Sequence, residues 1–186
     1  MAILPIVTYN DPILLQKAEP IEALTAEIES FIEDLFETME GADGVGLAAP
    51  QVGRSVRIFV MNADLMYDEE DKEALLLGDQ VFINPEIVEY SEEKVTFQEG
   101  CLSLPGLLDE VLRPEKIRIR FKDESFQDQE LTLDGWNARV VQHELDHLDG
   151  ILFIDHISAF KRAFHRSLLQ KIDEGNAPAS YPLVKK

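Results

Sequence analysis

Cysteine, long apolar runs and positive charge are all scarce in this chain of 186 residues. The single cysteine excludes a disulfide framework and fits a reducing compartment, so we expect a cytoplasmic protein. The first residues include no basic segment and no long apolar run, so neither export nor membrane insertion is expected. The chain length fits one domain with a substantial core, and we predict a single domain over residues 1–186.

Acidic residues outnumber basic ones, 36 against 17, and the formal net charge is −19. This charge argues against general nucleic-acid binding, and no DNA partner is expected. The basic residues are unevenly distributed, because residues 156–172 contain no acid but include Lys161, Arg162, Arg166 and Lys171. The conservative interpretation is a solvated helix face that balances an acidic body.

The most informative motif is H-E-x-x-H, which occurs once, with His143, Glu144 and His147 at its fixed positions. Two histidines four residues apart project from the same side of a helix, so their imidazoles can bind one metal ion. A glutamate beside the first histidine can transfer the protons of a metal-assisted hydrolysis. The motif therefore predicts a metal-dependent hydrolase, although a short pattern of this kind also occurs by chance on surface helices.

The context of the motif favours a buried helix. Trp136, Val140, His143 and His147 fall on one stripe of this helix. A second, apolar stripe consists of Ala138, Val141, Leu145 and Leu148. A helix that is apolar on two sides is buried, and buried histidines need polar partners, which a metal ion supplies. We therefore favour the metal site over the surface helix.

A tetrahedral catalytic site needs a third protein ligand and one open position. The metzincin pattern would require a histidine where this chain has Phe153. Glu174, the only glutamate after His147, remains an alternative ligand of the thermolysin type. We favour Cys101, because a thiolate is a strong ligand for zinc or ferrous iron and Gly100 allows close approach. The two other histidines are interpreted as surface or boundary residues, His156 and His165.

A third segment, Gly44–Gln51, is rich in small residues, which suggests that its backbone packs closely against another group. It is not a dinucleotide-binding loop, because Ala49 stands at the third glycine position and no strand leads into it. Gln51 ends the segment with a side-chain amide that can stabilise an oxyanion.

Together, these segments resemble the peptide deformylase family, which is marked by G-x-G-x-A-A-x-Q, E-G-C-L-S and Q-H-E-x-D-H in that order. The matching residues here are 44–51, 99–103 and 142–147. The resemblance covers most of the chain and implies a hydrolase that removes the N-formyl group from N-formylmethionine of nascent polypeptides and releases formate. One departure concerns an arginine that some members carry after the cysteine motif, where this chain reads Gly106-Leu107-Leu108.

The resemblance implies a role for each matching residue. Cys101, His143 and His147 are expected to bind one divalent metal ion, with Fe2+ as the native ion and Zn2+, Ni2+ or Co2+ as possible substitutes. The catalytic residues are expected to be Glu144 as general base and acid, Gln51 and the backbone N–H of Leu102 as oxyanion donors, and Gly46 through its backbone. The predicted substrate-binding residues are Gly44, Val45, Gly46, Glu99, Gly100, Trp136 and Val140. The resemblance also suggests docking of the basic C-terminal helix to the ribosome.

Hydrophobic periodicity predicts an α+β fold. Helices are expected to begin at Asn10-Asp11-Pro12 and to extend over residues 24–39 and about 158–173, with a flexible tail after the last. Strands are expected at residues 56–61, 81–84, 95–98, 116–121 and 131–133, the last two as a hairpin. Because the strands cluster between helices, we expect antiparallel sheets packed around a central metal-binding helix.

Overall fold

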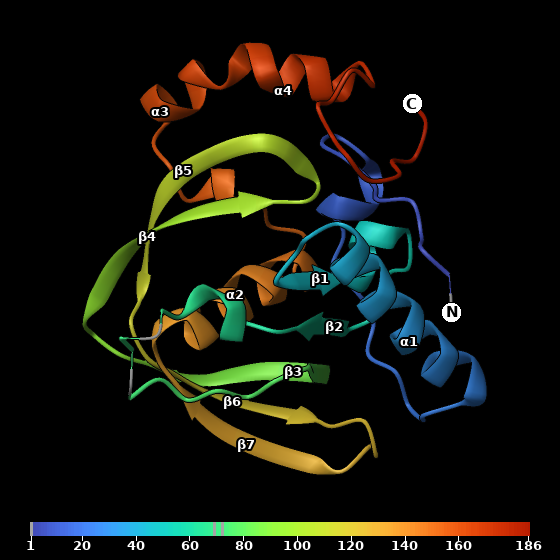
Figure 1. Cartoon of the computed structure of the whole chain (residues 1–186), viewed down its shortest axis with the longest axis vertical. Coiled ribbons are helices and arrows are strands. Elements are labelled where there is room, and N and C mark those ends of the chain that lie inside the picture. Colours follow the sequence, from blue (N-terminus) through green and yellow to red (C-terminus); the bar gives the residue numbers. More distant parts are fainter. Residues whose placement is uncertain (1, 69, 72) are drawn as a thin grey trace.

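The computed structural model describes residues 2–68, 70–71 and 73–186, and it has an α+β architecture (Figure 1). One antiparallel sheet has five strands and a second has two, and helix α2 (Gly135–Leu148) lies between them. The predicted fold class is therefore confirmed, including the central position of the helix that carries the H-E-x-x-H motif.

The larger sheet has the strand order β1-β2-β3-β6-β7. Its strands are β1 (Gly46–Ala48), β2 (Ile58–Met61), β3 (Gln80–Tyr90), β6 (Ile117–Lys122) and β7 (Asp128–Leu133). The predicted β6–β7 hairpin is confirmed, because Ile117 pairs with Leu133 and Ile119 pairs with Leu131. The smaller sheet is a hairpin of β4 (Lys94–Cys101) and β5 (Leu104–Pro114), and neither β1 nor β5 was predicted.

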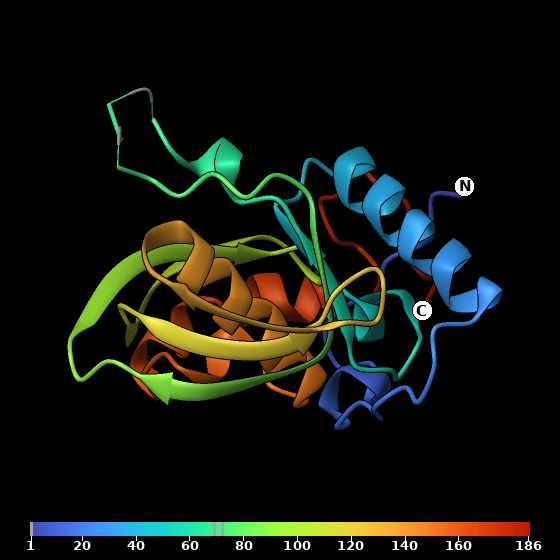
Figure 2. The same cartoon turned by 90° about the horizontal axis from the view of Figure 1, so that it is seen from below.

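Alternation along β2 explains how one sheet supports a helix on each face. Phe59 and Met61 join the apolar cluster beneath α2, whereas Ile58 and Val60 join the cluster beneath α1 (Ala26–Gly41). Successive side chains of a strand point to opposite faces, so a fully apolar strand is buried on both. Figure 2 shows the sheet strands between the two helices.

The N-terminal helices begin close to where the sequence predicts. At η1 (Pro12–Leu15), the side chain of Asp11 accepts a hydrogen bond from the backbone N–H of Ile13. At α1, Thr25 Oγ1 accepts from the backbone N–H of Ile28. Both are N-cap contacts that satisfy a free backbone donor.

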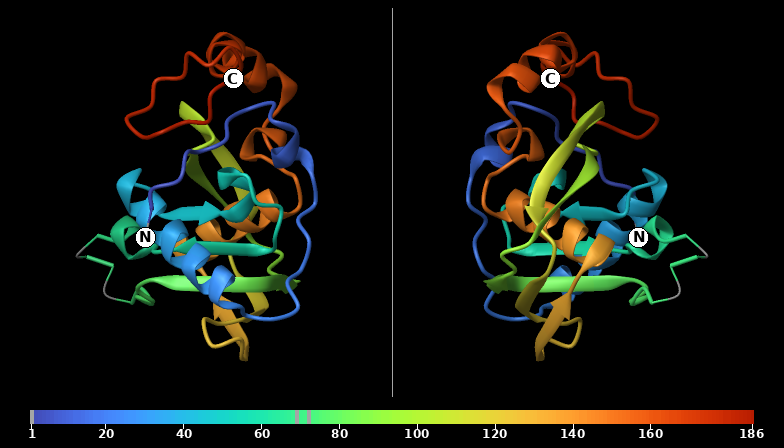
Figure 3. Two further views of the ribbon diagram at one scale, coloured as in Figure 1. Left: turned by 90° about the vertical axis from the view of Figure 1, so that its right-hand side faces the viewer. Right: turned by 90° about the vertical axis from the view of Figure 1, so that its left-hand side faces the viewer.

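The C-terminal helix differs from the prediction. It is divided at His165 into α3 (Ala159–Phe164) and α4 (Arg166–Asp173), which lie at the end of the molecule away from β7 (Figure 3). The hydroxyl of Ser158 caps α3 by accepting from the backbone N–H of Lys161. No helix in the described part of the chain is both long and apolar enough to cross a bilayer.

The segment after Asp173 also differs, because it packs on the body where the sequence predicts a flexible tail. The backbone of Ile6 accepts a hydrogen bond from Val184 N–H and donates one to the carbonyl of Pro182. Tyr181 and Leu183 pack against the apolar cluster beneath α1. These long-range contacts join the two ends of the chain, and a local pattern of proline and polar residues contains no sign of them.

Candidate active site

Three potential metal ligands converge at the centre of the molecule. His143 and His147 lie one turn apart on α2, and their ring centroids are 5.1 Å apart. Cys101 ends β4, next to a register shift between Gly100 and Cys101. One ligand atom from each of the three residues lies within 4.8 Å of the others, and Cys101 Sγ is 3.2 Å from His147 Nε2.

A buried carboxylate orients the first histidine. Glu99, which is 5% exposed, lies 2.8 Å from His143 Nδ1, and both of its oxygens also contact arginines. Burial would raise the pKa of Glu99, but hydrogen bonds from His143 and Arg113 hold it well below its usual range. An ionised carboxylate can only accept, so Nδ1 carries the proton and Nε2 is left free to bind a metal.

Two arginines complete this buried network. Arg113 Nε donates to Glu99 at 2.7 Å, and its NH1 group donates to Asp146 at 2.7 Å. Arg139 NH1 donates to Glu99 at 2.7 Å and to the carbonyl of Val111 at 2.9 Å. Both oxygens of Glu99 are therefore engaged with His143 and the two arginines. The sequence interpretation of Glu99 as a substrate-binding residue stays a prediction.

Glu144 is buried beside these ligands. It is 4% exposed, and burial raises the pKa of its carboxyl to about 7. No group in the described part of the chain forms a hydrogen bond with its Oε2. A Cβ at Gly46 would lie only 2.4 Å from Glu144 Oε1, so the glycine is what allows β1 to approach this side chain. The carboxyl is thus held against β1 with one oxygen that has no hydrogen-bond partner among the described residues.

Gln51 and the two residues after Cys101 form another side of the site. Gln51 Oε1 accepts from the backbone N–H of Ala48 at 2.8 Å, which fixes the orientation of the amide. Its Nε2 then faces Cys101 Sγ at 3.6 Å and Ser103 Oγ at 3.2 Å. The Leu102 side chain packs close to Gly44, because a Cβ there would be 2.9 Å from Leu102 Cδ1. The amide of Gln51 is therefore presented to the ligand cluster in a fixed direction.

A cavity of about 420 Å³ opens onto this cluster. With the exception of His147, which is buried behind it, every residue that the sequence predicts for the site lines this cavity. The ring of Trp136 packs against that of Phe97 in a tilted arrangement, with ring centroids 4.4 Å apart. Both Trp136 and Val140 also pack in the core beneath α2. These two side chains therefore serve as cavity wall and core at once.

Several lining residues escaped the sequence interpretation, among them Met66, Arg139 and Tyr181. Arg139 stands four residues before His143, so helical spacing alone could have placed it on the same side of α2. Arg113 and Tyr181 lie on segments that were not expected to reach the site, and no local signal identifies them.

The alternative ligands lie elsewhere. Glu174 is exposed at the end of α4, where its Oε1 accepts from Gln170. His156 contacts Asp146, and His165 contacts Asp109, each through Nε2. Within the described residues, the only cluster of potential metal ligands is therefore the one that contains Cys101.

The residues of this cluster fit a divalent transition metal. Burial alone would raise the pKa of the Cys101 thiol, but the charge of His147 and hydrogen bonds with both histidines lower it to about 5. A thiolate and two imidazoles are suitable donors for such an ion and leave a fourth position open.

Comparisons with known proteins agree with this geometry. A sequence model of the polypeptide deformylase family matches residues 3–163. The peptide deformylase of Salinibacter ruber is 46% identical over 99% of this chain and 95% of its own length. That of Cytophaga hutchinsonii is 42% identical over 96% of this chain and 95% of its own length. The crystal structure of Ehrlichia chaffeensis peptide deformylase in complex with actinonin superposes with a TM-score of 0.83 and is 40% identical, covering 94% of this chain and 98% of that one. The chain therefore belongs to the polypeptide deformylase family, the metal-dependent enzymes that remove the N-formyl group from nascent peptides.

Proposed function

We propose that the cavity beside Cys101, His143 and His147 is the active site of this enzyme, where it hydrolyses formyl-methionyl peptides to formate and a free N-terminus. The observation that carries this proposal is the convergence of the three potential ligands with a buried, partly unpaired Glu144 at one cavity. A cavity of this size with a few convergent polar groups is typical of a small-substrate site.

Cys101, His143 and His147 would hold one divalent ion. When bound, such an ion supplies a Lewis acid that lowers the pKa of a coordinated water to about 7. Fe2+ as the native ion, with Zn2+, Ni2+ or Co2+ as substitutes, stays a prediction, because one thiolate and two imidazoles accept all four ions. Metal analysis of protein purified without oxygen identifies the native ion.

Glu144 would move the protons of the reaction. Its free Oε2 accepts the proton of the attacking water and then returns it to the amine that leaves the formyl carbon. A carboxyl with a pKa near the working pH suits both steps, since it must be deprotonated first and protonated later. The Glu99 carboxylate cannot substitute for it, because both of its oxygens are already engaged.

Gln51 and Leu102 would stabilise the oxyanion that forms on the formyl oxygen. The amide of Gln51 is fixed through Ala48, so its Nε2 donor needs no reorganisation during the reaction. The backbone N–H of Leu102 is the second donor. The methionine side chain would lie against Val45, Trp136 and Val140, which all line the cavity. Gly44, Gly46 and Gly100 allow the peptide backbone to approach, since no side chain stands at these positions.

The proposal is tested by formate release from a formyl-Met peptide, measured on iron enzyme prepared without oxygen and on zinc enzyme. An acetyl-Met peptide of the same sequence is the matched control, assayed by release of acetate or of the free amine, which should be absent because its methyl group should not fit the tight site. If no formate is released with either metal, this cavity is not a deformylase site.

Gly46→Ala is expected to lower kcat by about 10- to 100-fold, because the added Cβ must displace the Glu144 carboxyl from its place against β1. Steady-state kinetics on the formyl-Met peptide measures the effect. Gly41→Ala is the matched control, since its Cβ would meet only the side chain of Ile3, at 3.2 Å, and Gly41 does not line the cavity. Equal kcat for the two variants would mean that Glu144 does not depend on this contact.

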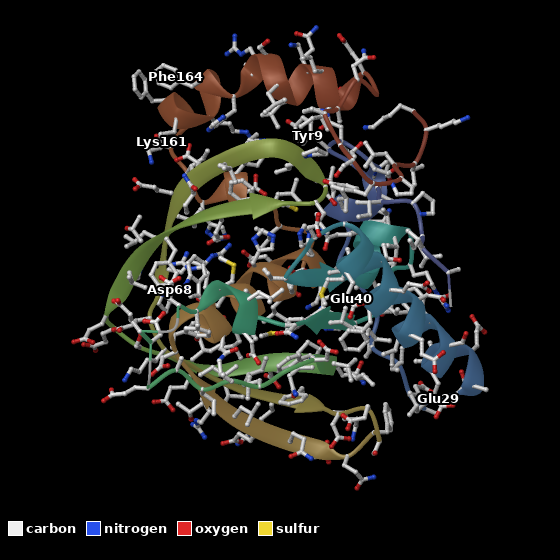
Figure 4. All side chains as sticks on the ribbon, in the orientation of Figure 1. Tyr9, Glu29, Glu40, Asp68, Lys161 and Phe164 are labelled. Carbon is white, nitrogen blue, oxygen red and sulfur yellow. The ribbon has the colours of Figure 1, made fainter. Side chains whose placement is uncertain are left out.

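Docking to ribosomal RNA through α3 and α4 is a second part of the proposal. Figure 4 shows Lys161 and Phe164 on α3 at the upper left, whereas on α1 Glu40 lies near the middle of the view and Glu29 toward the opposite end of the molecule. Lys161 and Arg162 pair with Asp109 and Asp155, so their charges are partly compensated. Arg166 and Lys171 are exposed and form no ion pair with any described residue, so they are available to phosphate groups.

The combined variant Arg166→Glu and Lys171→Glu is expected to bind ribosomes about tenfold more weakly at low salt, with unchanged kcat on short peptides. Co-sedimentation measures the binding. The variant Lys17→Glu with Lys94→Glu changes the net charge by the same amount at exposed positions outside these helices. If both variants bind ribosomes equally, these helices are not the docking surface.

A further inference from the structure

The C-terminal segment reaches the active site through Tyr181. The segment runs beside the N-terminal residues, and Leu183 forms a parallel bridge with Ile6 (Figure 1). Tyr181 lines the active-site cavity, and its hydroxyl donates a hydrogen bond of 2.8 Å to the carbonyl of Leu102. A neighbouring contact joins the same segments, because a Cβ at Gly106 would be 3.2 Å from Pro178. The end of the chain thus forms part of the wall beside the proposed oxyanion donors.

Tyr181 contacts a turn whose own two residues are not those that stabilise a tight hairpin turn. Leu102 and Ser103 are the two residues between paired Cys101 and Leu104, so they form the tight turn of the β4–β5 hairpin. The turns favoured in two-residue hairpins have positive φ at the first central residue and usually contain glycine or asparagine. Leu102 and Ser103 both have negative φ. Contacts from outside the hairpin are therefore expected to contribute to the conformation of this turn.

Three such contacts hold the turn. Tyr181 donates to the Leu102 carbonyl, the backbone N–H of Tyr9 donates to the Ser103 carbonyl at 3.1 Å, and Gln51 Nε2 donates to Ser103 Oγ at 3.2 Å. Of the three, only the Tyr181 bond is made to Leu102, whose N–H is a proposed oxyanion donor. The bond fixes the peptide plane between Leu102 and Ser103. The N–H of Leu102 belongs to the preceding plane, which meets this one at the Cα of Leu102, so the bond limits the rotation of that N–H indirectly, through the dihedral angles of Leu102.

We propose that Tyr181 is a positioning residue for the deformylation reaction, which aims the Leu102 N–H at the developing oxyanion through its hydrogen bond to the Leu102 carbonyl. This inference rests on the proposed function, because it assumes the oxyanion role of Leu102. Tyr181 itself need not touch the formyl group. Its effect should therefore fall on the transition state, where the oxyanion exists, and not on binding of the uncharged substrate.

Tyr181→Phe tests the proposal, because it removes the hydroxyl and keeps the ring that packs against the cluster beneath α1. We expect kcat to fall about tenfold, less than the loss of a whole oxyanion donor, since the N–H remains but is less well directed. KM for the formyl-Met peptide, the metal content and the melting temperature should stay unchanged. Tyr90→Phe is the matched control, since its exposed ring lies on β3, and its kcat should equal that of the wild type.

Each outcome decides the question. A fall in kcat alone supports the proposal. If wild type and both variants release formate at equal rates, Tyr181 has no positioning role, although the proposed function stands. A loss confined to KM, or one that follows metal loss, would make Tyr181 a substrate wall or a structural support and overturn the inference. If the wild type releases no formate, the proposed function fails, and the inference fails with it.

Discussion

Glu144→Gln is expected to lower kcat by about 100- to 10,000-fold while the metal stays bound, because a general base is lost without any change to the ligands. Glutamine has nearly the same shape as glutamate, so the close contact with Gly46 is preserved. Its amide cannot accept the proton of the attacking water or return it to the leaving amine. The measurement is kcat on the formyl-Met peptide, together with metal content by elemental analysis of the same preparation.

Glu40→Gln is the control, since it makes the same chemical change at an exposed position on α1. The combination of lost turnover and retained metal separates an enzyme from a protein that merely binds metal. Full activity in the Glu144 variant would show that another group transfers the protons. The burial of the Glu144 carboxyl and its raised pKa would then need a different explanation.

The parts of the fold that the sequence predicts correctly are those with strong local patterns. Alternating residues predict the β6–β7 hairpin, and helical spacing predicts that α2 is buried on two sides. Both patterns follow directly from the geometry of a single element. The spacing of His143 and His147 is local in the same sense, so the motif specifies two ligands before any tertiary structure is known.

What the sequence does not reveal depends on contacts between distant segments. Strand β5 contains Pro105, Gly106 and Pro114 and exposes Leu108 and Leu112, so it lacks the regular alternation of a half-buried strand. With β5 missed, Arg113 could not be placed beside Glu99, fourteen positions earlier in the chain. The contact of Glu99 with His143 was missed as well, because a carboxylate beside a ligand motif gives no indication of which buried side chains it meets.

The C-terminal segment is a second example. Residues 174–186 have the composition of a loop, and their contacts include pairing with Ile6, packing of Tyr181 and Leu183, and an ion pair between Lys186 and Asp173. Short segments of this kind gain their order from the surface on which they pack. A local rule predicts a tail here, although the segment forms part of the cavity wall.

Cys101→Ala is expected to cause the loss of both the metal and detectable turnover. Cys101 is the only thiolate donor, and His143 and His147 alone would leave two protein ligands, which is fewer than catalytic zinc sites use. Changing a group that only orients a ligand typically costs about 10- to 100-fold in metal affinity, so removing a ligand should cost more. Elemental analysis and formate release, measured on the same preparation, give the result.

Glu174→Ala is the matched variant, because it removes the alternative third ligand. If the enzyme were a zinc peptidase of the thermolysin type, Glu174 would be the third ligand, and the two variants would show the reverse pattern. The structure places Glu174 in solvent at the end of α4, bonded to Gln170. The Glu174 variant should therefore keep its metal and its kcat. Retention of metal and activity after Cys101→Ala would mean that the chain uses a different third ligand, and the proposed coordination would have to be abandoned.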